Sequence, residues 1–110
     1  MADGNNNGTS NGTADVTVVA APGATTTRMI PRYGISIYNN DTVTATVILQ
    51  LKDGASDRII EKYVIPSGDS RFNTSYISLD STTQSLEIYL SAAVTTNELD
   101  FVAKYRDEAQ

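Results

Sequence analysis

The clearest pattern in the chain is an alternation of apolar and polar residues between positions 42 and 51. A period of two over nine residues is typical of a β-strand with one buried face, and it is hard to reconcile with a helix. The Asp53-Gly54 pair that follows marks a turn. The stretch therefore predicts a strand whose buried face consists of Val43, Ala45, Val47, Leu49 and Leu51, with Thr42, Thr44, Thr46 and Gln50 on the other face.

Five further segments have strand-like composition, and polar turns separate them. One of them carries Ile59, Tyr63 and Ile65 on one side together with Glu61, whose charge indicates either a strand end or a register shift. No segment shows a 3.6-residue apolar stripe, so no helix is expected. Six strands with turn signals between them predict an all-β fold, either a small antiparallel β-sandwich or a barrel-like sandwich. The five segments are 33–38, 59–65, 71–79 (where irregular order suggests a bulge), 86–92 and 99–105.

Residues 1–27 differ from the rest of the chain, because they are mostly Gly, Asn, Thr, Ser and Ala. A segment of this composition buries too little apolar surface to offset its backbone entropy. We expect a flexible N-terminal arm over residues 1–27, ordered on assembly, and a β-sandwich domain over residues 28–110. A β-branched island at 15–21 has two interpretations, an edge strand of the domain or an extended segment that pairs with a neighbouring subunit's sheet.

The junction between the arm and the domain is basic in an otherwise acidic chain. Arg28 and Arg32 flank a rigid proline, Pro31, and arginines suit bidentate contacts with the carboxylates of a partner. The alternative is a solvated connector. Together with the β-branched island, the junction gives the predicted partner-binding residues, which are Val16, Val18, Val19, Arg28, Met29, Ile30 and Arg32.

The composition excludes the commonest catalytic mechanisms. The chain has no histidine and no cysteine, so the commonest general base and the thiolate nucleophile are both missing. Eight Lys and Arg against 13 Asp and Glu give a net charge of −5, which disfavours binding to nucleic acid. No run of 18 apolar residues is present, and the N-terminus lacks the features of a signal peptide, so no membrane partner is expected. We predict a protein that is not an enzyme.

Carboxylates offer two further motifs, and neither fits its template well. Asp41-Thr42-Val43 lacks the glycine of the aspartic-protease motif, so Asp41 is interpreted as a turn residue. Asp53, Asp57 and Glu61 are four residues apart, but they do not match the alternating ligands of a calcium loop. No catalytic residue, metal site or cofactor is predicted.

The six tyrosines are the remaining candidates for recognition. Strand parity places Tyr33, Tyr63 and Tyr105 on buried faces and Tyr38 and Tyr89 on exposed faces. An exposed tyrosine on a sheet stabilises cross-strand pairs, anchors an interface or forms a platform for a sugar.

The domain resembles small virion proteins of tailed bacteriophages that decorate or cement the capsid. The likeness is carried by the opening segment 35–41, the strand 43–51, the Pro66-Ser67-Gly68-Asp69 turn and the closing stretch 86–105. The resemblance implies a non-enzymatic module, commonly a homotrimer, that binds the major capsid protein on the outer capsid surface. It also implies that the protein is made in the host cytoplasm and that its arm clamps neighbouring capsid subunits.

Two rival functions stay open at this point. The first is a head–tail or tail structural component of a phage, because sequences of this pattern also resemble such proteins. A carbohydrate-binding or adhesive β-sandwich that uses exposed tyrosines and loop carboxylates is the other alternative.

Overall fold

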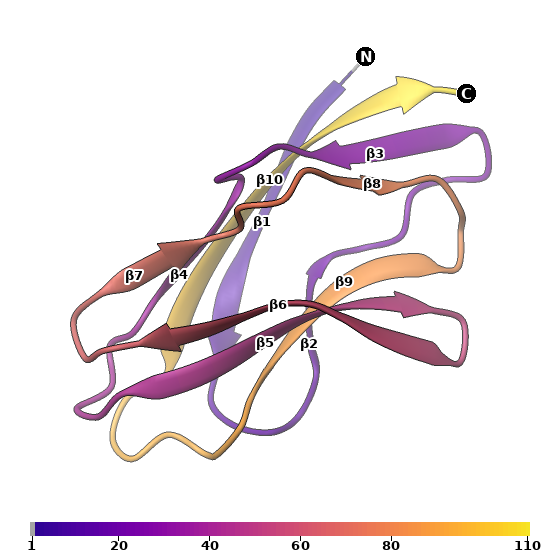
Figure 1. The fold of residues 1–110 in the computed structure, drawn as a ribbon. Helices are drawn as coiled ribbons and strands as arrows, with labels where there is room; N and C mark the ends of the chain where they lie inside the picture. Colours follow the sequence, from indigo (N-terminus) through magenta and orange to yellow (C-terminus); the bar gives the residue numbers. More distant parts are fainter. Residues whose placement is uncertain (1) are drawn as a thin grey trace.

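The computed structural model describes residues 2–110, which form ten β-strands and no helix (Figure 1). Accordingly, none of these residues belongs to a helix that could cross a membrane. The strands are β1 (Ala2–Ser10), β2 (Val16–Val19), β3 (Thr26–Ile30), β4 (Ile35–Tyr38), β5 (Ala45–Asp53), β6 (Ser56–Ile65), β7 (Ser70–Phe72), β8 (Ile77–Leu79), β9 (Gln84–Leu90) and β10 (Leu99–Ala109).

The strands form two antiparallel sheets that pack against each other. The first sheet contains β1, β10, β3, β4, β7 and β8, and the second has the order β2-β9-β5-β6. The predicted all-β antiparallel sandwich is therefore confirmed. The segment 71–79, predicted as one strand with a bulge, is instead interrupted and gives β7 and β8.

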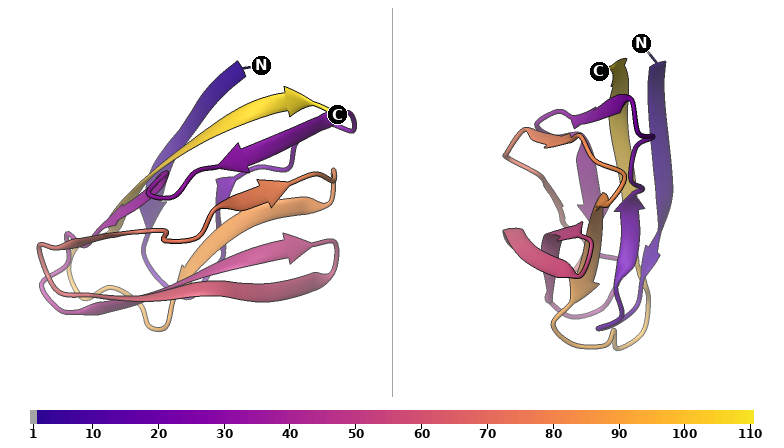
Figure 2. Two further views of the ribbon diagram at one scale, coloured as in Figure 1. Left: turned by 45° about the horizontal axis from the view of Figure 1, so that its top comes forward. Right: turned by 90° about the vertical axis from the view of Figure 1, so that its right-hand side faces the viewer.

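The strands pair with the topology of a jelly roll. β3 and β4 pair with successive stretches of the same edge of β10, and β8 and β7 pair with β3 and β4 in turn. β3 and β4 together form one long strand interrupted by a short break, and so do β7 and β8. Counted in this way, the ten strands reduce to eight. The first of these pairs with the eighth, the second with the seventh, the third with the sixth and the fourth with the fifth, which is the jelly-roll arrangement (Figure 2).

The core lies between the two sheets, and the predicted inner-face residues of β5 contribute to it, while Ile48 and Gln50 on the other face are also buried. Val47 and Leu49 are fully buried, and Leu51 packs against the core at the end of the strand. Val43 is an exception, with 47% of its surface exposed, because β5 begins only at Ala45. The alternation in the sequence therefore extends beyond the strand.

The strand β6 contains the register shift that Glu61 indicated. Leu49 of β5 pairs with Glu61 while Gln50 pairs with Ile59, so Ile60 is an extra residue on β6. The shift turns Ile59 to the outer face of the second sheet, where it is 65% exposed. The prediction that Ile59 shares the face of Tyr63 and Ile65 is therefore wrong.

The N-terminal segment differs most from its prediction. Residues 2–10 form β1, which pairs with β10 over nine residues, and residues 16–19 form β2 on the edge of the second sheet (Figure 1). The Asn6 side chain joins the two strands by donating to the Val18 carbonyl oxygen at 3.2 Å. Residues 2–27 are thus part of the sandwich rather than a separate arm, and residue 1 lies outside the described residues. Main-chain pairing in β1 compensates for the missing apolar side chains.

Candidate partner-binding surface

Four of the predicted partner-binding residues pack inside the protein. Val18, Val19 and Ile30 have no exposed surface, and Val16 is partly buried against the core. The island at 15–21 is therefore an edge strand of its own domain, which was one of its two interpretations. These four side chains contact the chain's own core, so the structure corrects their assignment to a partner interface.

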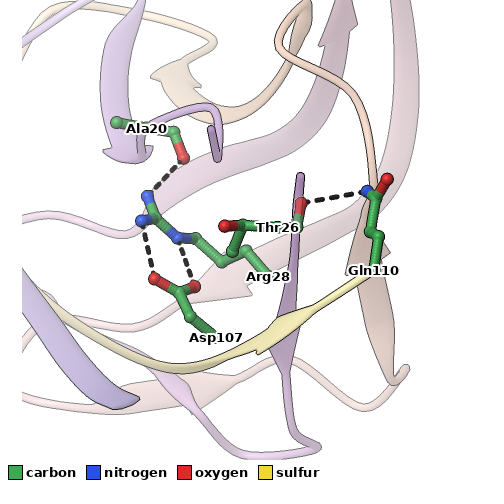
Figure 3. A network of polar contacts seen from close by, with 5 residues as sticks. All are labelled: Ala20, Thr26, Arg28, Asp107 and Gln110. Atoms are coloured by element: carbon green, nitrogen blue, oxygen red, sulfur yellow. Dashed lines mark hydrogen bonds and ion pairs between the residues drawn. The ribbon is translucent and has the colours of Figure 1, made fainter. Parts of the chain in front are cut away.

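Arg28 makes the bidentate carboxylate contact that was predicted, but the carboxylate belongs to the same chain. Its Nε and Nη2 atoms donate to Asp107 at 2.8 and 3.0 Å, and Nη1 donates to the Ala20 carbonyl oxygen at 2.9 Å (Figure 3). The guanidinium carbon also lies 4.2 Å from the centre of the Tyr105 ring. Hydrogen bonding to Asp107 raises the pKa of Arg28, and the same contact lowers the pKa of Asp107. Arg28 thus ties β3 and β10 to the end of β2.

Gln110 fastens the end of β10 beside this network. Its side-chain amide donates to the Thr26 carbonyl oxygen at 3.1 Å (Figure 3). It also donates to the Asp80 carbonyl oxygen at 2.9 Å. The two remaining predicted residues reach the surface. Met29 is half-buried on the outer face of the first sheet, and Arg32 is exposed in the break between β3 and β4.

The break between β3 and β4 turns a tyrosine outward. Tyr33 has a φ of 64°, a left-handed conformation that is uncommon for a residue with a side chain. Buried Asn73, in the break between β7 and β8, holds this segment by accepting from the Ile35 amide at 2.7 Å and donating to the Pro31 carbonyl oxygen at 2.9 Å. Tyr33 is 68% exposed as a result. Its predicted burial is wrong because the left-handed residue interrupts the alternation.

An aromatic-rich surface forms on the outer side of the first sheet, around this break. The register aligns Phe72 with Ser36 and Ser36 with Val102, so these residues lie in one row across β7, β4 and β10. The rings of Tyr33 and Phe72 meet edge to face with their centres 6.2 Å apart. Five of the eight exposed large apolar side chains belong to this surface, which we call the aromatic face: Tyr33, Tyr38, Phe72, Tyr76 and Val102.

A cleft of about 690 Å³ adjoins the aromatic face. It lies over the outer side of β1, β10 and β3, where the register brings Asp3, Arg106 and Met29 into one row. Tyr76 and Pro31, from the two breaks, also line it. The cleft therefore combines an aromatic wall with a polar floor. Nothing in the sequence indicates that these distant segments lie side by side.

The other tyrosines follow the predicted parity more closely. Tyr63 is buried and Tyr38 is 41% exposed, as predicted, while Tyr105 and Tyr89 are half-buried. Burial and a hydrogen bond to Glu61 raise the pKa of Tyr63. The Tyr105 side chain is half-buried because Arg28 covers its ring.

Asp41 links two loops at one end of the sandwich. Its carboxylate accepts hydrogen bonds from the main-chain amides of Thr42, Thr95, Thr96 and Asn97 at 2.8–3.2 Å. The bonds from Thr95 and its neighbours lower the pKa of Asp41 to about 2. The carboxylate thus supports the loops as a fixed acceptor, consistent with its interpretation as a turn residue.

The other carboxylates singled out in the sequence serve local structure. Glu61 accepts hydrogen bonds from Thr74, Ser75 and Tyr63, and these outweigh its burial so that its pKa is lowered. Asp53 accepts from the Thr83 hydroxyl at 2.7 Å. Within residues 2–110, no three His, Cys, Asp or Glu side chains gather in a group that could hold a metal ion.

No protein-family model matches the chain, and no curated protein matches it.

Proposed function

We propose that this protein is a non-enzymatic structural protein of a tailed-phage particle. In this role it binds the major capsid protein on the outer capsid surface, self-associates, most simply as a homotrimer, and joins neighbouring capsid subunits through its aromatic face. The observation that carries the proposal is the gathering of five exposed large apolar side chains on one side of one sheet. Contiguous exposed apolar surface marks interaction sites, and aromatic residues anchor interfaces.

Two further considerations support the proposal. The sequence resembles phage virion proteins of the decoration type, and jelly rolls recur among viral capsid proteins, although a fold alone does not define a function. Docking on a repetitive lattice also stabilises a small domain by mass action, and many weak contacts then suffice for stable attachment.

The structure changes how the proposal has to be tested. Deleting residues 1–27 would remove a strand from each sheet, so loss of binding would report unfolding rather than loss of an attachment arm. Single charge substitutions on the aromatic face avoid this problem. Phe72→Asp places a carboxylate in the row with Val102, and Ile59→Asp is a matched control on the outer face of the other sheet.

The experiment is co-sedimentation of the purified variants with capsids of the source phage that lack this protein. We expect the wild-type protein and Ile59→Asp to sediment with the capsids and Phe72→Asp to remain in the supernatant. Failure of the wild-type protein to bind, or equal binding of Phe72→Asp, would overturn the proposal. Native mass spectrometry gives the oligomeric state, and gold labelling of intact particles separates the capsid surface from a head–tail or tail position.

A further inference from the structure

The cleft beside the aromatic face carries polar groups that the fold does not use. Among residues 2–110, no hydrogen bond or ion pair involves the Lys104 ammonium or the Glu108 carboxylate. Arg106 donates to Asp3 through Nε alone, at 2.9 Å, which leaves both terminal nitrogens of its guanidinium facing solvent or a ligand. The cleft thus holds several hydrogen-bond donors and one strong acceptor without partners.

An apolar wall stands beside these groups. Tyr76, 55% exposed, lines the cleft together with Pro31 and Met29. Pro31 and Tyr76 come from the two chain breaks that interrupt the sheet, and buried Asn73 fixes both by donating to the Pro31 and Ser75 carbonyl oxygens at 2.9 Å. The tyrosine's main-chain position is therefore set by the fold before any ligand arrives, which reduces the entropy lost on binding.

The balance of charges narrows the class of ligand. Asp3 and Glu108 offset Lys104 and Arg106, so the cleft itself has no net charge, and the whole chain carries −5. This field does not attract a phosphate or another polyanion. A purely apolar ligand would bury the charged groups without giving them hydrogen bonds, which costs free energy.

A neutral polyhydroxyl ligand satisfies both sides of the cleft. Each hydroxyl group both donates and accepts, so it can accept from Lys104 or Arg106 and donate to Glu108, and hydrogen bonds to charged groups are stronger than neutral ones. The C–H face of a sugar ring packs on the ring of an exposed tyrosine. The cleft volume of about 690 Å³ also lies within the range of small-ligand sites, ~300–1,000 Å³. We propose that this cleft is a saccharide-binding site, with Tyr76 as the stacking platform and Lys104, Arg106 and Glu108 as the groups that bind the hydroxyls.

The proposal does not depend on the capsid role. Jelly rolls occur in lectin domains as well as in capsid proteins, so the fold is compatible with either function or with both. A virion protein with such a cleft would also have a means of adhering to sugar-coated surfaces.

The test begins with the full chain, fluorescently labelled, on an array of bacterial and animal glycans. The saccharide bound most strongly is then titrated against the wild-type protein, Tyr76→Ala, Glu108→Gln and Tyr38→Ala by calorimetry. Tyr38→Ala is the matched control, because it removes an exposed tyrosine from the same sheet face outside the cleft. We expect Tyr76→Ala and Glu108→Gln each to weaken binding by roughly tenfold or more and Tyr38→Ala to bind as the wild type does.

Several results would overturn the saccharide site. These are no binding to any glycan on the array, equal binding by Tyr76→Ala and the wild type, or loss of binding in Tyr38→Ala alone. If Tyr76→Ala weakens capsid co-sedimentation and no glycan is bound, the cleft belongs to the protein interface instead. Circular dichroism of each variant confirms that it is folded before the titration is interpreted.

Discussion

The ring of Tyr105 lies against the main chain of Gly4, its cross-strand partner in β1. A Cβ atom at position 4 would come within 2.4 Å of that ring. Gly8 pairs with Phe101 in the same way, and a Cβ atom at position 8 would lie 2.9 Å from the Phe101 ring. Both glycines lie on the inner face of β1, where the aromatic rings of β10 occupy the space of the missing side chains. The two glycines therefore allow a strand with few apolar side chains to dock closely on the sandwich.

Gly8→Ala should destabilise the protein by about 1–3 kcal/mol, because its methyl group must displace the buried ring of Phe101. Asn7→Ala is the control, since Asn7 is exposed on the other face of the same strand. Urea denaturation measures the free energy of unfolding of both variants. Equal stabilities would mean that β1 does not depend on this close approach.

Arg28 and Asp107 should be energetically coupled. Removing either partner leaves the other charge partly buried without its bidentate contact, and bonds between charged groups are worth about 1.5–3 kcal/mol. A double-mutant cycle with Arg28→Met and Asp107→Asn should give a coupling energy of roughly 1 kcal/mol or more. The same cycle on Arg106 and Asp3, an exposed pair, should give less. Similar coupling in the two pairs would contradict the role of Arg28 in tying three strands together.

Acid should destabilise the protein, in part through Asp41. The pKa of Asp41 is about 2 in the folded protein and ~3.9 in an unfolded chain, so the unfolded state takes up the proton first. The contribution of Asp41 to stability is then complete above about pH 5, falls as the pH drops through ~4 and is lost near pH 2. The lowered pKa values of Glu61, Asp69 and Asp107 act in the same direction.

Asp41→Asn tests this assignment. It should lower the Tm at pH 7 by roughly 5 °C and make the decline between pH 5 and pH 2.5 shallower than in the wild type, because the titrating group is gone. Thermal unfolding at a series of pH values measures both effects. Asp57→Asn is the control on an exposed hairpin. An unchanged acid profile in Asp41→Asn would show that other carboxylates dominate.

Tyr33 should contribute to binding but not to stability. Its left-handed backbone conformation is one that asparagine tolerates better, while its ring is largely exposed on the aromatic face. Tyr33→Asn should change the free energy of unfolding by less than about 1 kcal/mol, since relief of strain offsets the lost contact with Phe72. In the co-sedimentation assay for the proposed capsid role, binding should fall by roughly tenfold. Tyr33→Phe, which keeps the ring, should bind as the wild type does, and weak binding by it would argue against an apolar role.

Much of the sandwich could be predicted from period-two patterns. Inner-face residues such as Ile35 and Ile37 flank a polar residue, Ser36, and hydrophobic burial follows that alternation directly. β1 was missed because its inner-face positions 4, 6, 8 and 10 are glycine, asparagine, glycine and serine, which carry no hydrophobic signal. The information that makes residues 2–10 a strand lies about 100 residues away, in the rings of Tyr105 and Phe101.

The candidate surface could be predicted less well than the fold. Strand parity predicts the exposure of Tyr38 correctly. It does not predict the exposure of Tyr33, because this residue has a left-handed backbone conformation that no local sequence pattern indicates. The chemistry expected of Arg28 was also correct, although the sequence could not show that Asp107 of the same chain accepts its hydrogen bonds. Pairings between distant positions depend on topology, and single-sequence patterns do not contain it.

The pairing of β1 with β10 also has a practical consequence for protein engineering. Residue 2 lies opposite Asp107, so both ends of the described chain leave the molecule at the same pole (Figure 1). A short glycine-rich linker could join them. The hairpin turn at Gly54 is a suitable place to open the ring, because a Cβ atom at that position would meet no other atom within 4 Å. Such a circular permutant would keep every strand pair of the jelly roll and would present its new termini at a different loop, which gives two separate positions for displaying a fused peptide.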